Sequence, residues 1–145
     1  MLQDLVTLKE SGLVHGILVI NDGSTDKTKE IAESFRSEGV EVINHTKNMG
    51  KGFCFYEGAL WAKRNNAKFL GMFDADLSEI PKKEVEKMLR PLKDPKVDMV
   101  IGEVFFSTRI GLIKDFASLS GQRIIRMRAL KPLFIGNKTW LNLIA

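Results

Sequence analysis

The chain has 145 residues, enough for one domain with a buried core, and it is 44% hydrophobic and 28% charged, as soluble globular proteins are. No apolar run approaches the ~18 residues that a membrane-spanning helix needs, and the first residues do not resemble a signal peptide, so we expect a cytoplasmic protein. Cys54 is the single cysteine, which excludes an internal disulfide. It has no His or Cys beside it in the sequence, so we expect no zinc site there.

The net charge of +4 is unevenly distributed along the chain. Residues 1–104 carry 15 Lys and Arg against 17 Asp and Glu, whereas residues 105–145 carry 7 against a single Asp. Such a basic segment indicates an anionic partner, and phosphate, a membrane surface and nucleic acid are the general candidates. No nucleic-acid recognition motif is present, so we expect no nucleic-acid partner. We predict one domain over 1–145, in which 105–145 faces an acceptor or a membrane.

The apolar pattern predicts alternating helices and strands. The expected elements, in order, are a helix from Leu2 that stops at Gly12, a strand over 15–21, a turn over 22–26, a helix that ends at Gly39, a strand over 40–44, a loop over 45–52, a helix over 53–65, a strand over 68–73, a helix that opens at Pro81, a strand over 97–104 and an amphipathic basic helix over 116–131. Strands separated by helices of this length indicate an α/β fold with a mostly parallel sheet and helices on both faces.

Asp74-Ala75-Asp76 closes the apolar strand that ends at Phe73. Two carboxylates at the end of a buried strand are costly unless a cation or hydrogen-bond donors neutralise them. A hard divalent ion takes such oxygen ligands and in turn holds phosphates, so the pattern favours a metal-bridged phosphate compound. Two alternatives remain open. In the first, Asp74 is a turn residue at the end of the strand and Asp76 caps the next helix. In the second, Asp74 is the nucleophile of a phosphatase of the haloacid-dehalogenase type.

Two further polar loops follow strands, and parallel strands bring all three loops to one edge of the sheet. Asp22-Gly23-Ser24-Thr25-Asp26 joins a strand to a helix N-terminus, where Gly23 permits the turn and Asp22 accepts hydrogen bonds from a base or ribose. Asn48-Met49-Gly50-Lys51-Gly52 brings one cation, Lys51, to a phosphate, although it lacks the spacing of a P-loop. The alternatives are a well-capped turn and a solvated lysine.

Arg123, in Ser120-Gly121-Gln122-Arg123, offers a guanidinium fork that suits phosphate, with the start of a surface helix as the alternative. His15 and His45 are interpreted as structural, because neither has a charge relay that the sequence reveals. No Ser-His-Asp or Cys-His arrangement is indicated.

The ordered set of motifs resembles the family-2 glycosyltransferases of the GT-A fold, and within them the dolichyl- and polyprenyl-phosphate sugar transferases. The resemblance spans roughly residues 13–128. The matching segments are Leu18 to Asp26, Asn48-x-Gly50-Lys51-Gly52 with Ala59, Asp74-Ala75-Asp76-Leu77-Ser78 with Pro81, and Ser120-Gly121-Gln122-Arg123-x-x-Arg126.

This resemblance implies a Rossmann-like GT-A domain that takes a UDP- or GDP-sugar as donor. It implies that the loop of Asp22, Gly23 and Ser24 contacts the nucleotide. Asp74 and Asp76 engage the ribose or diphosphate through Mg²⁺ or Mn²⁺, and Asp74, Asp76 and Arg123 are the implied catalytic residues. Arg123 and Lys51 match basic residues near the phosphates. A lipid-phosphate acceptor brings its own nucleophile, so no protein base is required, and such an acceptor places the enzyme at the cytoplasmic face of a membrane.

Relatives begin with an apolar strand that ends in a Pro-x-x-Asn-Glu-like loop, and this chain starts at what matches the following helix. We therefore expect a partial domain whose first strand is missing and which stops within an apolar segment. A sheet without that strand exposes an edge that invites homodimerisation. The alternative function is a non-catalytic remnant that binds nucleotide or a partner protein without transferring sugar.

Overall fold

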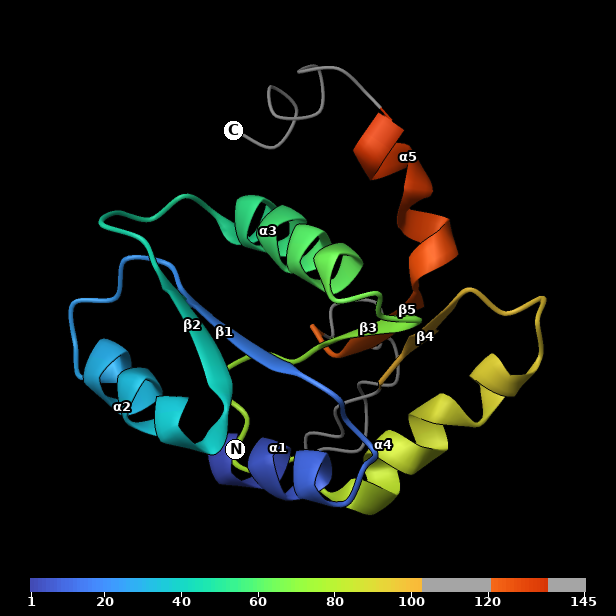
Figure 1. Ribbon diagram of the computed structural model, residues 1–145, viewed down its shortest axis with the longest axis horizontal. Helices are drawn as coiled ribbons and strands as arrows, with labels where there is room; N and C mark the ends of the chain where they lie inside the picture. The colour runs from blue at the N-terminus through green and yellow to red at the C-terminus, as the bar shows by residue number, and fades with distance from the viewer. Residues whose placement is uncertain (103–120, 136–145) are drawn as a thin grey trace, which may run out of the picture.

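A computed structural model describes residues 1–102 and 121–135 of the chain (Figure 1). Most of the basic segment predicted over 105–145, and the first residues of the helix predicted over 116–131, lie outside the described residues. No helix within the described ranges is both long enough and apolar enough to cross a membrane.

The first part of the chain builds a two-stranded parallel sheet. Its elements are α1 (Leu2–Glu10), β1 (Ile17–Asn21), α2 (Thr28–Ser34), the 3₁₀ helix η1 (Phe35–Glu38) and β2 (Val40–Asn44). The register pairs Ile17 with Val40 at one end and Asn21 with Asn44 at the other. Apolar side chains of α1, α2 and both strands pack together, so the predicted crossover from strand to helix to parallel strand is confirmed.

The second part builds a three-stranded sheet with an antiparallel strand in its centre. Its elements are α3 (Lys51–Arg64), β3 (Phe69–Met72), α4 (Lys82–Leu89), η2 (Pro91–Lys93), β4 (Met99–Ile101), β5 (Arg123–Arg126), η4 (Met127–Leu130) and α5 (Lys131–Ile135). β5 lies between β3 and β4 and runs antiparallel to both. β3 and β4 therefore run parallel to each other without pairing.

The helix predicted over 116–131 is wrong for the residues that the structure describes. Residues 123–126 form β5, and the 3₁₀ helix η4 follows. The cause is burial, because Ile124 and Ile125 are only 3% and 7% exposed in the centre of the sheet. Two adjacent β-branched side chains fit a strand that is covered on both faces, and this tertiary environment overrides the helical spacing of the surrounding charges.

Helix α3 connects the two sheets by packing against both β1 and β3. Figure 1 shows α3 on one side of the strands and α1, α2 and α4 on the other, which confirms the α/β class with helices on both faces. Ala59 of α3 is fully buried against Ile125 and Leu130. On the other side, Leu8 of α1 packs with buried side chains of α4 and β5.

Candidate functional site

The turn after β1 is shaped by a buried amide and by a glycine. Asn21 is 4% exposed; its side-chain oxygen accepts from the Ser24 amide at 3.1 Å, and its side-chain nitrogen donates to Asn44 Oδ1 at 3.0 Å. Gly23 has a φ of 74°, and a Cβ at this position would lie 2.6 Å from the backbone nitrogen of Asn48. The turn after β1 and the loop after β2 therefore touch in a way that only glycine permits.

Asp22 anchors that second loop and the start of α3. Its Oδ1 accepts from the Met49 amide at 2.7 Å, and its Oδ2 accepts from the Gly50 amide at 2.9 Å. Gly50 is the N-cap residue of α3, so the carboxylate lies at a helix N-terminus, where negative charge is favoured. Its hydrogen bond with His45, followed by that from Met49, lowers the pKa of Asp22 to about 2.

His45 joins Asp22 to α3. Its Nδ1 lies 2.7 Å from Asp22 Oδ1, and its Nε2 lies 2.6 Å from Glu57 Oε2. Carboxylates accept hydrogen bonds, so this geometry suits a ring that carries a proton on each nitrogen. Hydrogen bonding to Asp22, with a further contribution from Glu57, raises the pKa of His45. The sequence interpretation of His45 as structural missed this relay, because its partners lie 23 and 12 residues away.

The thiol of Cys54 lies beside Asp22 and His45, and one donor atom from each of the three lies within 4.8 Å of the others. The sequence has no histidine beside Cys54, but the fold brings His45 close to it. These donor types are compatible with a divalent metal, but both nitrogens of His45 are already engaged and backbone N–H groups point at Asp22. Burial raises the pKa of the Cys54 thiol to about 11, which keeps it protonated. This cluster is therefore a hydrogen-bonded network.

The acidic motif after β3 lies on the other side of the α3 N-terminus. Lys51, the first residue of α3, donates from Nζ to Asp74 Oδ1 at 2.6 Å. A Cβ on Gly121 would overlap the Asp74 carboxylate, so the buried backbone before β5 presses against this group. Arg123 pairs with Met72 in the β3–β5 register, two residues before Asp74. The structure thus brings Asp74 and Lys51 into contact and places the Gly121-x-Arg123 element beside Asp74.

Asp76 lies in an exposed turn that is closed by a hydrogen bond from the Leu77 amide to the Asp74 carbonyl at 3.4 Å. Among the described residues it makes no hydrogen bond or ion pair. The alternative interpretation of Asp76 as a helix cap is wrong, because Pro81 is the N-cap of α4 and no side chain caps that helix. Two neighbouring carboxylates, one with free oxygens, have the donor chemistry that Mg²⁺ and Mn²⁺ prefer.

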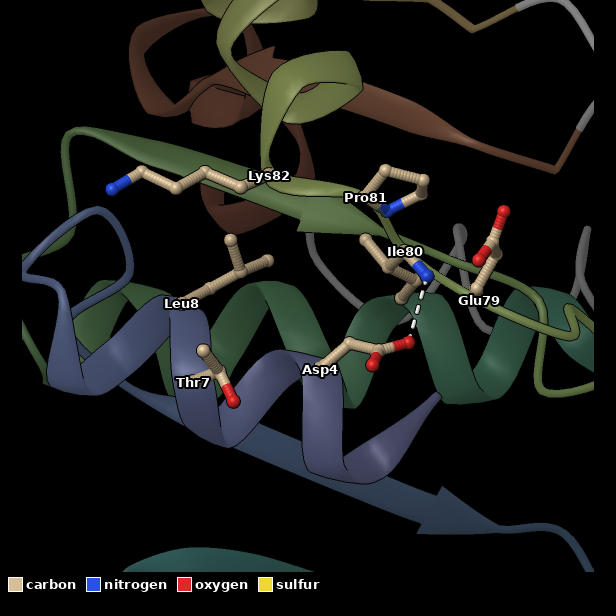
Figure 2. Close-up of a pocket in the computed structure, with 7 residues that line it drawn as sticks. All are labelled: Asp4, Thr7, Leu8, Glu79, Ile80, Pro81 and Lys82. Atoms are coloured by element: carbon tan, nitrogen blue, oxygen red, sulfur yellow. Dashed lines mark hydrogen bonds between the residues drawn. The ribbon is translucent and has the colours of Figure 1, made fainter.

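A pocket lies between α1 and residues 79–82, as Figure 2 shows. Asp4 closes one side of it by accepting a hydrogen bond from the Ile80 amide at 2.9 Å. None of the residues that line this pocket belongs to the predicted site. The candidate site is therefore formed by the converging loops around the α3 N-terminus and not by this pocket.

The family model described as "Glycosyl transferase family 2" matches residues 2–139 of the chain. The chain belongs to this family. The match agrees with the α/β, GT-A-like architecture, and it gives no support to the phosphatase alternative or to the non-catalytic remnant.

Two curated relatives are similar to part of the chain, and one of them has the name of a glycosyltransferase. An uncharacterized protein of Methanocaldococcus jannaschii is 40% identical over 100 residues, which are 69% of this chain and 39% of the relative. The 4,4'-diaponeurosporenoate glycosyltransferase of Staphylococcus aureus is 36% identical over 75 residues, which are 50% of this chain and 19% of the relative. The chain thus spans well under half the length of these relatives. No solved structure matches it at a significant level.

Proposed function

We propose that this chain is the nucleotide-sugar-binding part of an inverting or retaining glycosyltransferase that takes a UDP- or GDP-sugar as donor. The single observation that carries the proposal is the arrangement at the α3 N-terminus. The Gly50 amide donates to Asp22, which follows β1 of the first sheet. The next residue, Lys51, pairs with Asp74, which follows β3 of the second sheet. Two motifs that are 52 positions apart in the sequence therefore share one helix end.

In this proposal the two clusters divide the donor between them. The turn of Asp22, Gly23 and Ser24 holds the base and ribose, and Asp74 and Asp76 hold a Mg²⁺ or Mn²⁺ ion with the diphosphate. Such an ion, when bound, neutralises the charge that develops on the leaving diphosphate. Lys51 adds a positive charge beside that position, and its exposed side chain is able to leave Asp74 for a phosphate oxygen.

We further propose an anionic acceptor, with a lipid phosphate at the cytoplasmic face of a membrane as the leading candidate. Support comes from Arg123, which follows Gly121 by two residues, and from the excess of basic residues over 105–145. The named relative from Staphylococcus acts on 4,4'-diaponeurosporenoate, so an acceptor of that kind is the alternative to test. A negatively charged acceptor supplies its own nucleophile and requires no protein base.

Isothermal titration of the protein with UDP- and GDP-sugars, with and without Mn²⁺, tests the donor site. We expect metal-dependent binding of one nucleotide class, and we expect Asp76→Ala to weaken it by about tenfold or more, the worth of a charge-assisted contact. Glu30→Ala, on the exposed side of α2, is the matched control and should bind as wild type does. Binding that needs no metal, or that is unchanged in Asp76→Ala, contradicts the proposal.

A further inference from the structure

We propose that His45 is a positioning residue that fixes Asp22 and the loop ending at Gly50 in the arrangement that receives the nucleotide. The role in nucleotide binding rests on the proposed function, whereas the effect of His45 on the loop does not. The family resemblance assigns no role to His45, and neither does any motif that the sequence singles out.

The ring of His45 is held from several sides. Asp22 accepts from Nδ1 at 2.7 Å, Glu57 of α3 accepts from Nε2 at 2.6 Å, and the Phe53 ring lies 5.6 Å away between centroids at an interplanar angle of 59°. The His45 side chain is 10% exposed, and the two carboxylates are 20% and 24% exposed. A largely buried cation with an anion on each side has one preferred orientation, and it therefore restricts both carboxylates.

The position of Asp22 determines the start of α3. The same carboxylate that accepts from His45 also accepts from the amides of Met49 and Gly50. Gly50 caps α3, and Lys51 follows it and reaches Asp74. A continuous series of contacts thus leads from His45 through Asp22 to the acidic motif after β3. Loss of the His45 contact removes one of the donors to Oδ1 of Asp22, which also accepts from the Met49 amide, and loosens the loop.

The charge on His45 makes this arrangement dependent on pH. The groups that face the ring are Asp22 from the turn after β1, and Glu57 and the protonated thiol of Cys54 from α3. Both carboxylates favour the imidazolium, so the pKa of His45 lies above its ordinary value of 6.5. Both N–H donations are present below that value, and one of the two is lost as the pH rises through the raised pKa.

NMR titration of the protein between about pH 6 and pH 9 tests the positioning role directly. We expect the ring signals of His45 and the amide signals of Met49 and Gly50 to change with one shared midpoint above pH 6.5. Glu57→Gln should lower that midpoint while preserving the hydrogen bond from Nε2. His45→Gln should abolish the pH-dependent change of the two amides, whereas His15→Gln, an exposed residue before β1, should leave it intact.

Nucleotide affinity in the presence of Mn²⁺ provides the second readout. We expect wild-type affinity to fall by about tenfold across the His45 titration, which is in the usual range for coupled sites. We expect the affinity of His45→Gln to be low and independent of pH, and the affinity of Glu57→Gln to equal that of wild type at low pH. The proposal is overturned if the amide signals of Met49 and Gly50 do not titrate with the ring signals of His45. It is also overturned if His45→Gln binds nucleotide as wild type does. A wild-type protein that binds no nucleotide overturns the proposed function, and the amide titration still decides the role of His45 in the loop.

Discussion

Two groups of carboxylates lie on either side of the α3 N-terminus, and they differ in how their oxygens are satisfied. In the first group, Asp22 accepts from two backbone amides and from His45, which in turn binds Glu57. In the second group, Asp74 has an ion pair with Lys51, whose side chain is 68% exposed, and Asp76 has no partner among the described residues. In the first group, protein donors occupy most of the acceptor sites of Asp22, whereas the second group has more free oxygens to offer to a ligand.

This difference assigns different tasks to motifs that look alike in sequence. A carboxylate whose oxygens accept from fixed backbone donors holds loops in place and has little capacity left for an ion. An exposed carboxylate pair with one mobile lysine is able to exchange that lysine for a cation and a phosphate. We therefore expect substitutions in the first group to reduce stability as well as nucleotide binding, and substitutions in the second to reduce ligand binding with little effect on stability.

The largest effect on stability is expected for Gly23→Ala. The residue has a φ of 74°, which costs an L-residue about 1–2 kcal/mol, and its Cβ would meet the backbone of Lys47 and Asn48 at 2.6 Å, which adds about 1–3 kcal/mol. We expect the free energy of unfolding to fall by about 2–5 kcal/mol, measured by chemical denaturation.

Gly12→Ala is the matched control for this substitution. Gly12 has a φ of 73°, and a Cβ added there would have no neighbouring atom within 4 Å, so only the backbone cost of about 1–2 kcal/mol applies. Equal losses for Gly23→Ala and Gly12→Ala would show that the two loops are not pressed together.

A smaller and pH-dependent effect is expected for Asp22→Asn. The pKa of Asp22 is lowered from 3.8 to about 2, so the ionised carboxylate stabilises the fold fully above pH 3.8 and loses this contribution as the pH falls towards about 2. The advantage of wild type over Asp22→Asn should therefore shrink as the pH is lowered through this range. Denaturation curves of both proteins at stepped pH values provide the measurement.

Asp76→Asn, in the second group, is the comparison for this experiment. Its exposed carboxylate has no partner among the described residues, so the substitution should leave the free energy of unfolding within about 0.5 kcal/mol of wild type. An Asp22→Asn difference that stays constant from neutral to acid pH would contradict the assignment of Asp22 as a loop anchor.

The smallest effect on stability is expected for Lys51→Met. An exposed ion pair contributes about 0–1 kcal/mol, so the free energy of unfolding should change by no more than that, while the affinity for a nucleotide diphosphate should fall. Lys87→Met removes a similarly exposed pair with Glu84 and should leave both quantities near wild type. A loss of stability above about 2 kcal/mol in Lys51→Met would show that the second group is as tightly built as the first.

Local sequence patterns predicted most of the elements around the site. The strand before Asp22, the glycine turn and the helix after Gly50 follow from short-range preferences for β-branched residues, positive φ and capping, which neighbouring residues decide. The pattern of residues 116–131 predicts a helix, whereas the structure has the strand β5 at Arg123–Arg126. This segment forms a strand because it pairs with β3 and β4, which lie more than 20 positions earlier in the chain.

The sequence by itself determined which groups follow the strands and begin the helix around the site. These are a glycine turn after one strand, an acidic pair after another, and a cation at the start of a helix. Only the tertiary structure decided which of these groups bind each other. His45 and Glu57 complete the environment of Asp22, and the backbone at Gly121 abuts Asp74. Such contacts join residues that are far apart along the chain, and their geometry depends on how the sheets and α3 pack, which no local propensity encodes.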